Sequence, residues 1–191
     1  MSVNAWIIIA VAIAVVLYGI MIYNGLVALK HSVSKAWANI DVLLKQRHDE
    51  LPKLIATCKE YMKFEGDTLE KVIQARSQVS SAREQQDIRS LGKAETTLRA
   101  GLGQLFALAE NYPELKSNES FRQLQSRIST LENTIADRRE LYNDSVNANN
   151  VRIEQFPDVI IARKFGFQAA ELLQFSDAEK TDVDVASLFK S

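Results

Sequence analysis

Hydrophobic and polar positions divide the chain into an apolar head and a charged body. Residues 1–29 contain no Asp, Glu, Lys or Arg, and all 23 basic and 24 acidic residues follow them. A helix needs about 20 apolar residues to cross a hydrocarbon core of ~30 Å, and residues 5–29 supply that length. Trp6 lies near one end and Tyr23 toward the other, as is typical of aromatic residues at the two membrane interfaces. The pattern predicts a transmembrane helix over 5–29 after a short extension, 1–4.

A cleaved secretory signal and a buried core helix are the alternatives for this segment. A signal has a positively charged start, a shorter apolar run and a small-residue cleavage site, whereas residues 1–4 carry no Lys or Arg. No other segment is apolar enough to surround a buried helix. Lys30 and Lys35 follow the span, and positive residues favour the cytoplasmic side. We therefore expect a single-pass protein of the cell (inner) membrane with its N-terminus outside and its C-terminal domain in the cytoplasm.

After the span, apolar residues recur at steps of three and four, which predicts helices with one buried, coiled-coil-like face. The first stripe runs through residues 33–61 with Arg47 in its one gap. Pro52 lacks a backbone donor and is expected to kink this helix near Leu51. Gly66 is expected to end it.

Two shorter helices and one long helix are predicted next. Asp67 and Glu70 have the form of a capping box at the start of the second helix, and residues 91–109 form the third. A fourth stripe begins near Asn118 and continues until Pro157 stops it. A shorter amphipathic piece follows, and residues 176–191 are expected to be loosely ordered.

These stripes predict an all-α fold, because each apolar face must be buried against another helix. The N-terminal transmembrane helix continues into an elongated antiparallel four-helix bundle over residues 30–157. A short amphipathic segment and tail occupy 158–191. Only 7 Gly and 3 Pro occur in 191 residues, which suits long helices.

Charge and cysteine content exclude some classes of protein. The formal net charge is -1, and no basic stripe is evident, so nucleic acid is not an expected partner. Cys58 is the single cysteine and has no partner for an intramolecular disulfide.

Three blocks of sequence together resemble the LemA family of bacterial membrane proteins. They read AWANIDVLLKQRHDELPKLI (36–55), ENYPELKSNESFRQLQ (110–125) and RRELYNDSVNANNVRIEQFP (138–157). The departures are Glu50, where the family tends to have a large apolar residue, and Lys53, where it tends to have Asn. The resemblance implies an anchored helical bundle facing the cytoplasm and supplies no enzymatic reaction. Family members are associated with envelope stress or signalling and with neighbouring membrane peptidases.

The residues that carry most chemistry do not converge in the sequence. His31 and His48 are ~25 Å apart along one helix and cannot share a metal ion, and neither E-x-x-H nor H-E-x-x-H occurs. Gly101 and Gly103 lack the third glycine of a nucleotide-binding loop. Cys58 lies on the apolar stripe without a His partner. We expect no catalytic, cofactor-binding or metal site and no small-molecule substrate, that is, a protein that is not an enzyme.

Five polar residues fall on or beside the core stripes and are the candidate site residues. They are Asp41, Arg47, Asp49, Arg138 and Asn149. Such residues often fix the register of helices, and a buried or half-buried ion pair between the first and fourth helices is favoured over a functional pocket. In the span, Ala10 and Ala14 form a small-x-x-x-small pair that suits membrane-helix packing.

The sequence therefore predicts a membrane-anchored helical scaffold or adaptor that acts through self-assembly and protein–protein contacts. Its expected partners are the lipid bilayer, further copies of itself as a homo-oligomer, and another membrane protein. The alternative is a regulatory subunit of a membrane-bound enzyme such as an envelope-stress peptidase.

Overall fold

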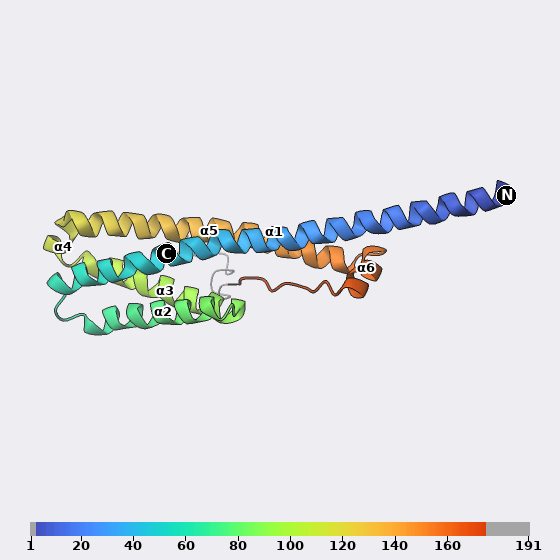
Figure 1. Ribbon diagram of the computed structural model, residues 1–191. Coiled ribbons are helices and arrows are strands. Elements are labelled where there is room, and N and C mark those ends of the chain that lie inside the picture. The colour runs from blue at the N-terminus through green and yellow to red at the C-terminus, as the bar shows by residue number, and fades with distance from the viewer. Residues whose placement is uncertain (1–2, 175–191) are drawn as a thin grey trace, which may run out of the picture. The chain divides into compact units, whose positions relative to one another are not determined.

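The computed structural model describes residues 3–174, and within them the chain is helical with no strand (Figure 1). The helices, in chain order, are α1 Val3–Tyr61, α2 Gly66–Glu84, α3 Ile88–Ala109, α4 Pro113–Ser117, α5 Glu119–Glu154 and α6 Asp158–Phe165. The predicted all-α class is confirmed. The prediction for residues 176–191 lies outside the described residues.

The chain divides into two compact units, and the long helices α1 and α5 contribute to both. The first unit comprises residues 1–40 and 137–172, and the second comprises 41–136 and 173–191.

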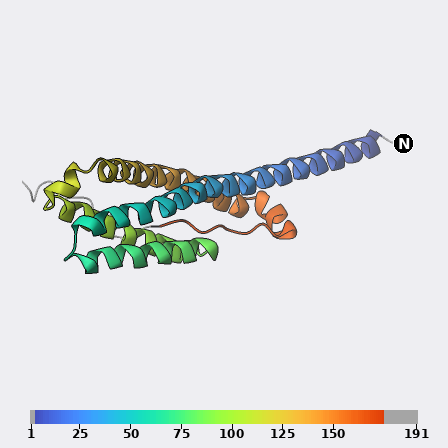
Figure 2. The ribbon, with the colours of Figure 1, turned by 60° about the vertical axis from the view of Figure 1, so that its left-hand side comes forward.

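The second unit contains the four-helix bundle. It is built from the last part of α1, from α2 and α3, and from the first part of α5, with successive helices running in opposite directions (Figures 1 and 2). Leucines from α1 and α3 form much of the core, and each fully buried leucine contributes about 1.5–3 kcal/mol. Within this bundle, the leucines of α1 and α3 with at most 2% exposure are Leu44, Leu51, Leu54, Leu91, Leu98, Leu102 and Leu105.

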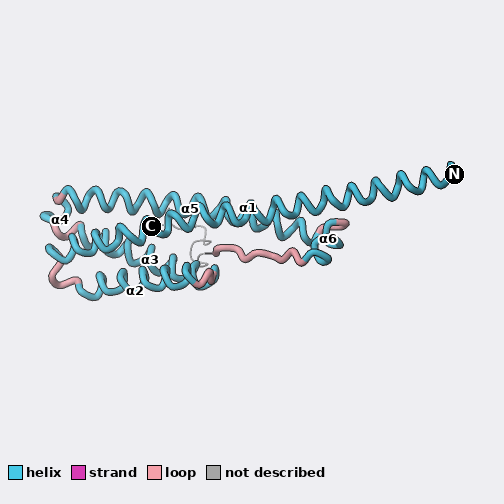
Figure 3. Tube along the Cα trace, in the orientation of Figure 1, coloured by secondary structure: helices cyan, strands magenta, loops and turns pink. Residues whose placement is uncertain are grey.

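The first unit is simpler. Ile22 and Leu26 of α1 form a small buried cluster with Ile153 of α5 and Ala162 of α6. Helix α6 ends at Gly166, whose φ of 71° lies in the left-handed region that favours glycine. An extended segment then runs on from α6 and is drawn as a loop in Figure 3.

Several predicted helix ends are correct, and others are not. Asn118 Oδ1 accepts a hydrogen bond from Phe121 N at 3.0 Å and starts α5 as predicted, and α5 ends before Pro157. The first helix ends at Tyr61 rather than at Gly66.

The predicted capping box at Asp67 is wrong. Helix α2 begins at Gly66 with Glu65 as its cap residue, and no side chain caps it. Asp67 therefore lies inside the first turn, where its carboxylate interacts favourably with the helix dipole instead. Helix α1 continues through Pro52 to its end, and a bend near Leu51 stays a prediction.

Candidate functional site

A buried charged cluster crosses the four-helix bundle. Arg47 of α1 is 1% exposed, and its guanidinium donates hydrogen bonds to Glu95 of α3 and to Glu132 of α5. Glu95 is 3% exposed, and Glu132 is only slightly more open. Hydrogen bonds between ionised partners are the strong ones, so one cation joins three helices.

Burial and charge act against each other on these groups. Burial raises the pKa of Glu95, while the charge of Arg47 opposes that rise. For Arg47, burial lowers the pKa, but the two carboxylates outweigh it and hold the guanidinium charged. Arg47 Nε is buried and has no hydrogen-bond partner within residues 3–174.

Further polar contacts join α1 to α2. Arg83 Nε pairs with Asp41 Oδ1 at 3.1 Å. Arg76 donates to the backbone oxygen of His48 at 3.0 Å and lies 2.6 Å from its Nε2. Burial and the neighbouring Arg76 charge lower the pKa of His48, so its ring is neutral at pH 7.

Glu50, one of the two residues that depart from the family pattern, is also buried. It is 7% exposed and pairs through Oε1 with Arg127 of α5 at 2.8 Å. Together with Arg47–Glu132, this is a second ion pair between α1 and α5, the two helices predicted to be joined in this way.

Three of the five predicted polar residues lie outside the buried core. Asp41 is half-buried and Asp49 is exposed, each beside the stripe of α1, whereas Arg138 is exposed and its predicted place on the buried stripe of α5 is wrong. The next residue in the chain, Arg139, is half-buried and takes the place predicted for Arg138, because the α5 stripe steps by four and then three at this point. Asn149 is buried, as its position on the stripe predicts.

Asn149 belongs to a group of side chains that hold the extended segment after α6. Asn150 Oδ1 accepts from Ala170 N at 2.9 Å, and Asn150 Nδ2 donates to Ala170 O at 2.9 Å. Asn149 Nδ2 donates to Gln168 O at 3.3 Å, and the Tyr142 hydroxyl donates to Glu171 O at 2.9 Å. The side-chain amide of Asn150 thus pairs with the segment as a neighbouring strand would. It provides hydrogen-bond partners for backbone groups that lie outside a helix and so lack helical partners.

The block over residues 110–125 also makes internal contacts. The Tyr112 hydroxyl lies 3.3 Å from Glu65 Oε1, and Asn118 Nδ2 donates to the Tyr61 hydroxyl at 3.1 Å. These bonds tie the α3–α5 connection to the turn between α1 and α2.

The residues that carry nucleophilic or metal chemistry are dispersed. Cys58 is buried, and burial raises the pKa of its thiol to about 12. The thiol is therefore protonated and unreactive at neutral pH, as is typical of a buried structural cysteine. Within residues 3–174 no group of three or more His, Cys, Asp or Glu side chains is placed to hold a metal ion.

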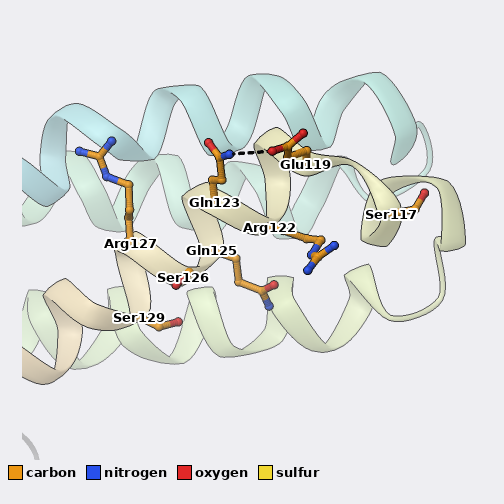
Figure 4. A pocket seen from close by; sticks show the side chains of 8 residues that line it. All are labelled: Ser117, Glu119, Arg122, Gln123, Gln125, Ser126, Arg127 and Ser129. Carbon is orange, nitrogen blue, oxygen red and sulfur yellow. Dashed lines mark hydrogen bonds between the residues drawn. The ribbon is translucent and has the colours of Figure 1, made fainter.

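The second unit has a surface groove of about 1000 Å³, lined by polar residues, along the first turns of α5. Figure 4 shows its lining side chains, among them Arg122, Gln125 and Ser129. Its lining comes from Ser117 and the α5 residues that follow it. A hollow of this kind suits a polypeptide surface better than a small molecule, because ligand pockets are concave and mostly apolar.

The first unit holds a smaller cavity of about 260 Å³. Lys30 and Ser34 of α1 line it together with the start of the extended segment, Gly166 to Gln168.

One stretch of α1 is long and apolar enough to cross a membrane, and its mean hydropathy is 2.8. Only 6% of that stretch is buried. Ala10 and Ala14 are both exposed, so nothing within residues 3–174 packs on them. By length and composition, α1 is a candidate span.

Comparison with known proteins extends the resemblance. Protein LemA of Metamycoplasma hominis is 28% identical over 165 residues, which cover 86% of this chain and 74% of that protein. Magnetosome protein MamQ 2 of Paramagnetospirillum magneticum is 24% identical over 194 residues, with 90% of this chain and 71% of that protein covered. Magnetosome protein MamQ of Magnetospirillum gryphiswaldense is 29% identical over 89 residues. The LemA family profile matches residues 36–186, and the chain belongs to the LemA family.

Proposed function

We propose that this protein is a single-span, membrane-anchored scaffold or adaptor whose helical body works by contacts with copies of itself and with other proteins. One observation carries the proposal. The polar residues that mark the three family blocks are engaged in contacts inside the chain. Arg47 pairs across the bundle, Asn118 and Tyr112 fasten one connection, and Asn149 and Asn150 hold the extended segment.

A catalytic centre needs reactive groups that open onto a cavity a substrate can enter. The charged cluster around Arg47 is instead closed by its own partners, which is how structural ion pairs behave. The family membership and the apolar stretch of α1 support the membrane anchor. Lys30 and Lys35 directly after that stretch support a cytoplasmic body.

The test is the mass and composition of the full-length protein extracted from membranes in mild detergent. A particle that contains several copies of this chain alone supports the scaffold. A monomer contradicts self-assembly. A defined complex with one second membrane protein contradicts it too and supports a regulatory subunit instead.

Cysteine cross-linking then examines the groove on α5. Ser126→Cys places a thiol in the groove, and Ser77→Cys places one on an exposed position of α2 as the matched control. The buried native Cys58 does not interfere. If the α5 groove contacts a second copy, oxidation of membranes gives a disulfide dimer with Ser126→Cys and none with Ser77→Cys. Equal cross-linking of the two variants excludes a specific contact there.

A further inference from the structure

Helix α6 and the turn before it carry large apolar side chains that are more than half exposed within the described chain. Phe156 is 81% exposed, and Ile160 and Phe165 are each 56% exposed. Arg163 and Lys164 are exposed on the same helix, three and four residues after Ile160, and so lie on its side of the helix. Large exposed apolar side chains and basic residues on one short helix suit a membrane interface, because long Lys and Arg side chains can lie along apolar surface while their charges reach the headgroups.

The opposite side of α6 is fixed to the base of the apolar head. Ala162 is buried against Ile22 and Leu26 of α1, and Ile161 packs against the same cluster. The ring of Tyr23 contacts Phe165 edge-on, with centroids 4.9 Å apart, and Phe167 at 5.8 Å.

Helix α6 is also fixed to α5. Arg152 near the end of α5 pairs with Asp158, the first residue of α6. These contacts lie within the first unit, so α6 has a defined position along α1.

That position corresponds to one face of the bilayer. From Ala5 to Tyr23, α1 rises ~27 Å, which is close to the ~30 Å thickness of a hydrocarbon core. Tyr23 therefore comes to the level of the headgroups if residue 5 starts at the opposite interface. Phe165 of α6, which contacts Tyr23, is at the same level, and Ala162 packs beside it against Ile22 and Leu26.

We propose that α6 is a second membrane contact of this protein. Phe156, Ile160 and Phe165 insert into the interfacial layer of the same bilayer that α1 crosses, and Arg163 and Lys164 face anionic lipid headgroups. This inference rests on the membrane anchor of the proposed function. It adds that residues 22–29 of α1 are partly covered by protein, so the lipid-exposed span ends near Met21.

The occupant is lipid rather than protein for reasons of position and charge. The apolar side chains are beside the end of the span, where lipid is the surrounding medium. Lys30 adds a third exposed basic residue near this level, and anionic leaflets attract basic residues placed beside a span.

The experiment measures the depth of a fluorescent probe in reconstituted full-length protein. Ile160→Cys, Ser77→Cys and Val11→Cys are each labelled with an NBD group. Labelling is selective because Cys58 is buried and its pKa is about 12. The labelled proteins are reconstituted into phosphatidylcholine vesicles containing one part in about three of phosphatidylglycerol. Nitroxide lipids then serve as quenchers, with the nitroxide at the headgroup or deep in the acyl chain.

The proposal expects the label at 160 to show blue-shifted emission and to be quenched by the headgroup nitroxide more than by the deep one. The label at 77 stays in water and is not quenched, and the label at 11 is quenched most by the deep nitroxide. Arg163→Gln together with Lys164→Gln reduces the quenching at 160 when phosphatidylglycerol is present and leaves it unchanged in phosphatidylcholine alone.

The two failures are distinguishable. If the label at 11 is quenched but the label at 160 behaves like the label at 77, α6 does not touch the bilayer and the inference is overturned while the anchor stands. If the label at 11 is not quenched, the anchor itself is absent and both proposals fall.

Discussion

Removing the Arg47 guanidinium gives the sharpest test of how the bundle is held together. In the native protein the Arg47 cation is shared by two carboxylates, Glu95 at 3% and Glu132 at 14% exposure. The substitution Arg47→Met removes this cation from both. Breaking a buried pair by removing one partner costs about 3–5 kcal/mol, because a charge is left buried without compensation. We expect the free energy of unfolding of the second unit to fall by that amount.

The matched control is Arg138→Met. This residue lies on α5 and is exposed, and exposed substitutions usually change stability by less than about 0.5 kcal/mol. Urea unfolding of the full-length protein in detergent, followed by circular dichroism, compares the two variants. Equal midpoints and slopes for Arg47→Met and Arg138→Met would refute the reasoning.

The pH dependence provides a second check on the same variant. Burial already raises the pKa of Glu95, and Arg47 opposes the rise, so without Arg47 the pKa rises further. A raised folded-state pKa means that the folded protein binds more protons, and stability falls as pH increases through that pKa. The deficit of Arg47→Met should therefore be small near pH 4 and grow toward pH 7. Replacing all three residues with apolar ones of similar volume should recover most of the loss, since apolar substitution of a buried ion pair is often neutral or stabilising.

Four further outcomes are expected. Cys58 should react with Ellman's reagent at pH 8 only after unfolding, because a pKa of about 12 leaves about one thiol in ten thousand ionised; rapid reaction of the folded protein would contradict its burial. Asn150→Ala should cost about 1–3 kcal/mol and speed hydrogen exchange at the Ala170 amide, whereas Asn147→Ala, at an exposed position, should leave that exchange unchanged. Gly92→Ala should destabilise by about 1–3 kcal/mol, because a Cβ there would lie 2.0 Å from Gln174 O, whereas Gly103→Ala, with open space around it, should be neutral or stabilising in the same thermal melts. The lowered pKa of His48 means that the unfolded chain binds the proton more readily, so stability should fall as pH decreases below about 6.5, and His48→Gln should remove that part of the pH dependence in a titration of the unfolding midpoint.

The sequence predicted Arg47 correctly and Arg138 incorrectly because the phase of the apolar stripe is fixed on α1 and ambiguous on α5. On α1 the buried positions are Ile40, Leu44, Arg47, Leu51 and Leu54. The apolar residues before and after Arg47 fix which positions of α1 face the core. Arg47 is therefore the residue that fills the gap between Leu44 and Leu51.

On α5 the phase is ambiguous. Ile128, Ile135, Tyr142 and Asn149 are buried seven residues apart, and the position between two of them falls either three or four residues after the first. The structure uses the step of four, which makes Glu132 and Arg139 partly buried and leaves Arg138 exposed. The sequence alone does not decide between the step of three and the step of four, because neither Leu131 nor Tyr142 distinguishes them.

The pattern of hydrophobic and polar positions could not predict the partners of Arg47. Nothing on the stripe of α3 sets Glu95 apart from the neighbouring Ala94, which is also buried, and the chain has 24 acidic residues that a buried arginine might meet. Only the relative rotation of three helices selects Glu95 and Glu132. The same holds for the asparagines, whose partners are backbone groups of a segment 20 residues further along the chain.

Polar residues in a family motif are commonly interpreted as a functional site, and here the physical argument points the other way. Arg47 is paired with Glu95 and Glu132, while Asn149 and Asn150 hydrogen-bond each other and the segment after α6. Buried polar networks of this kind specify one arrangement of helices at a cost in stability. Once these groups are engaged, surfaces left for function must be sought on the outside, where a polar groove follows α5 and apolar side chains stand exposed on α6. Exposed Phe156, Ile160 and Phe165 lower the solubility of a free body without stabilising its fold, and large exposed apolar groups mark a contact with a membrane or a partner. Their exposure, on a helix whose Phe165 packs against Tyr23 at the end of the apolar stretch, is left unexplained by a purely structural interpretation of the family motif, and the membrane contact of α6 accounts for it.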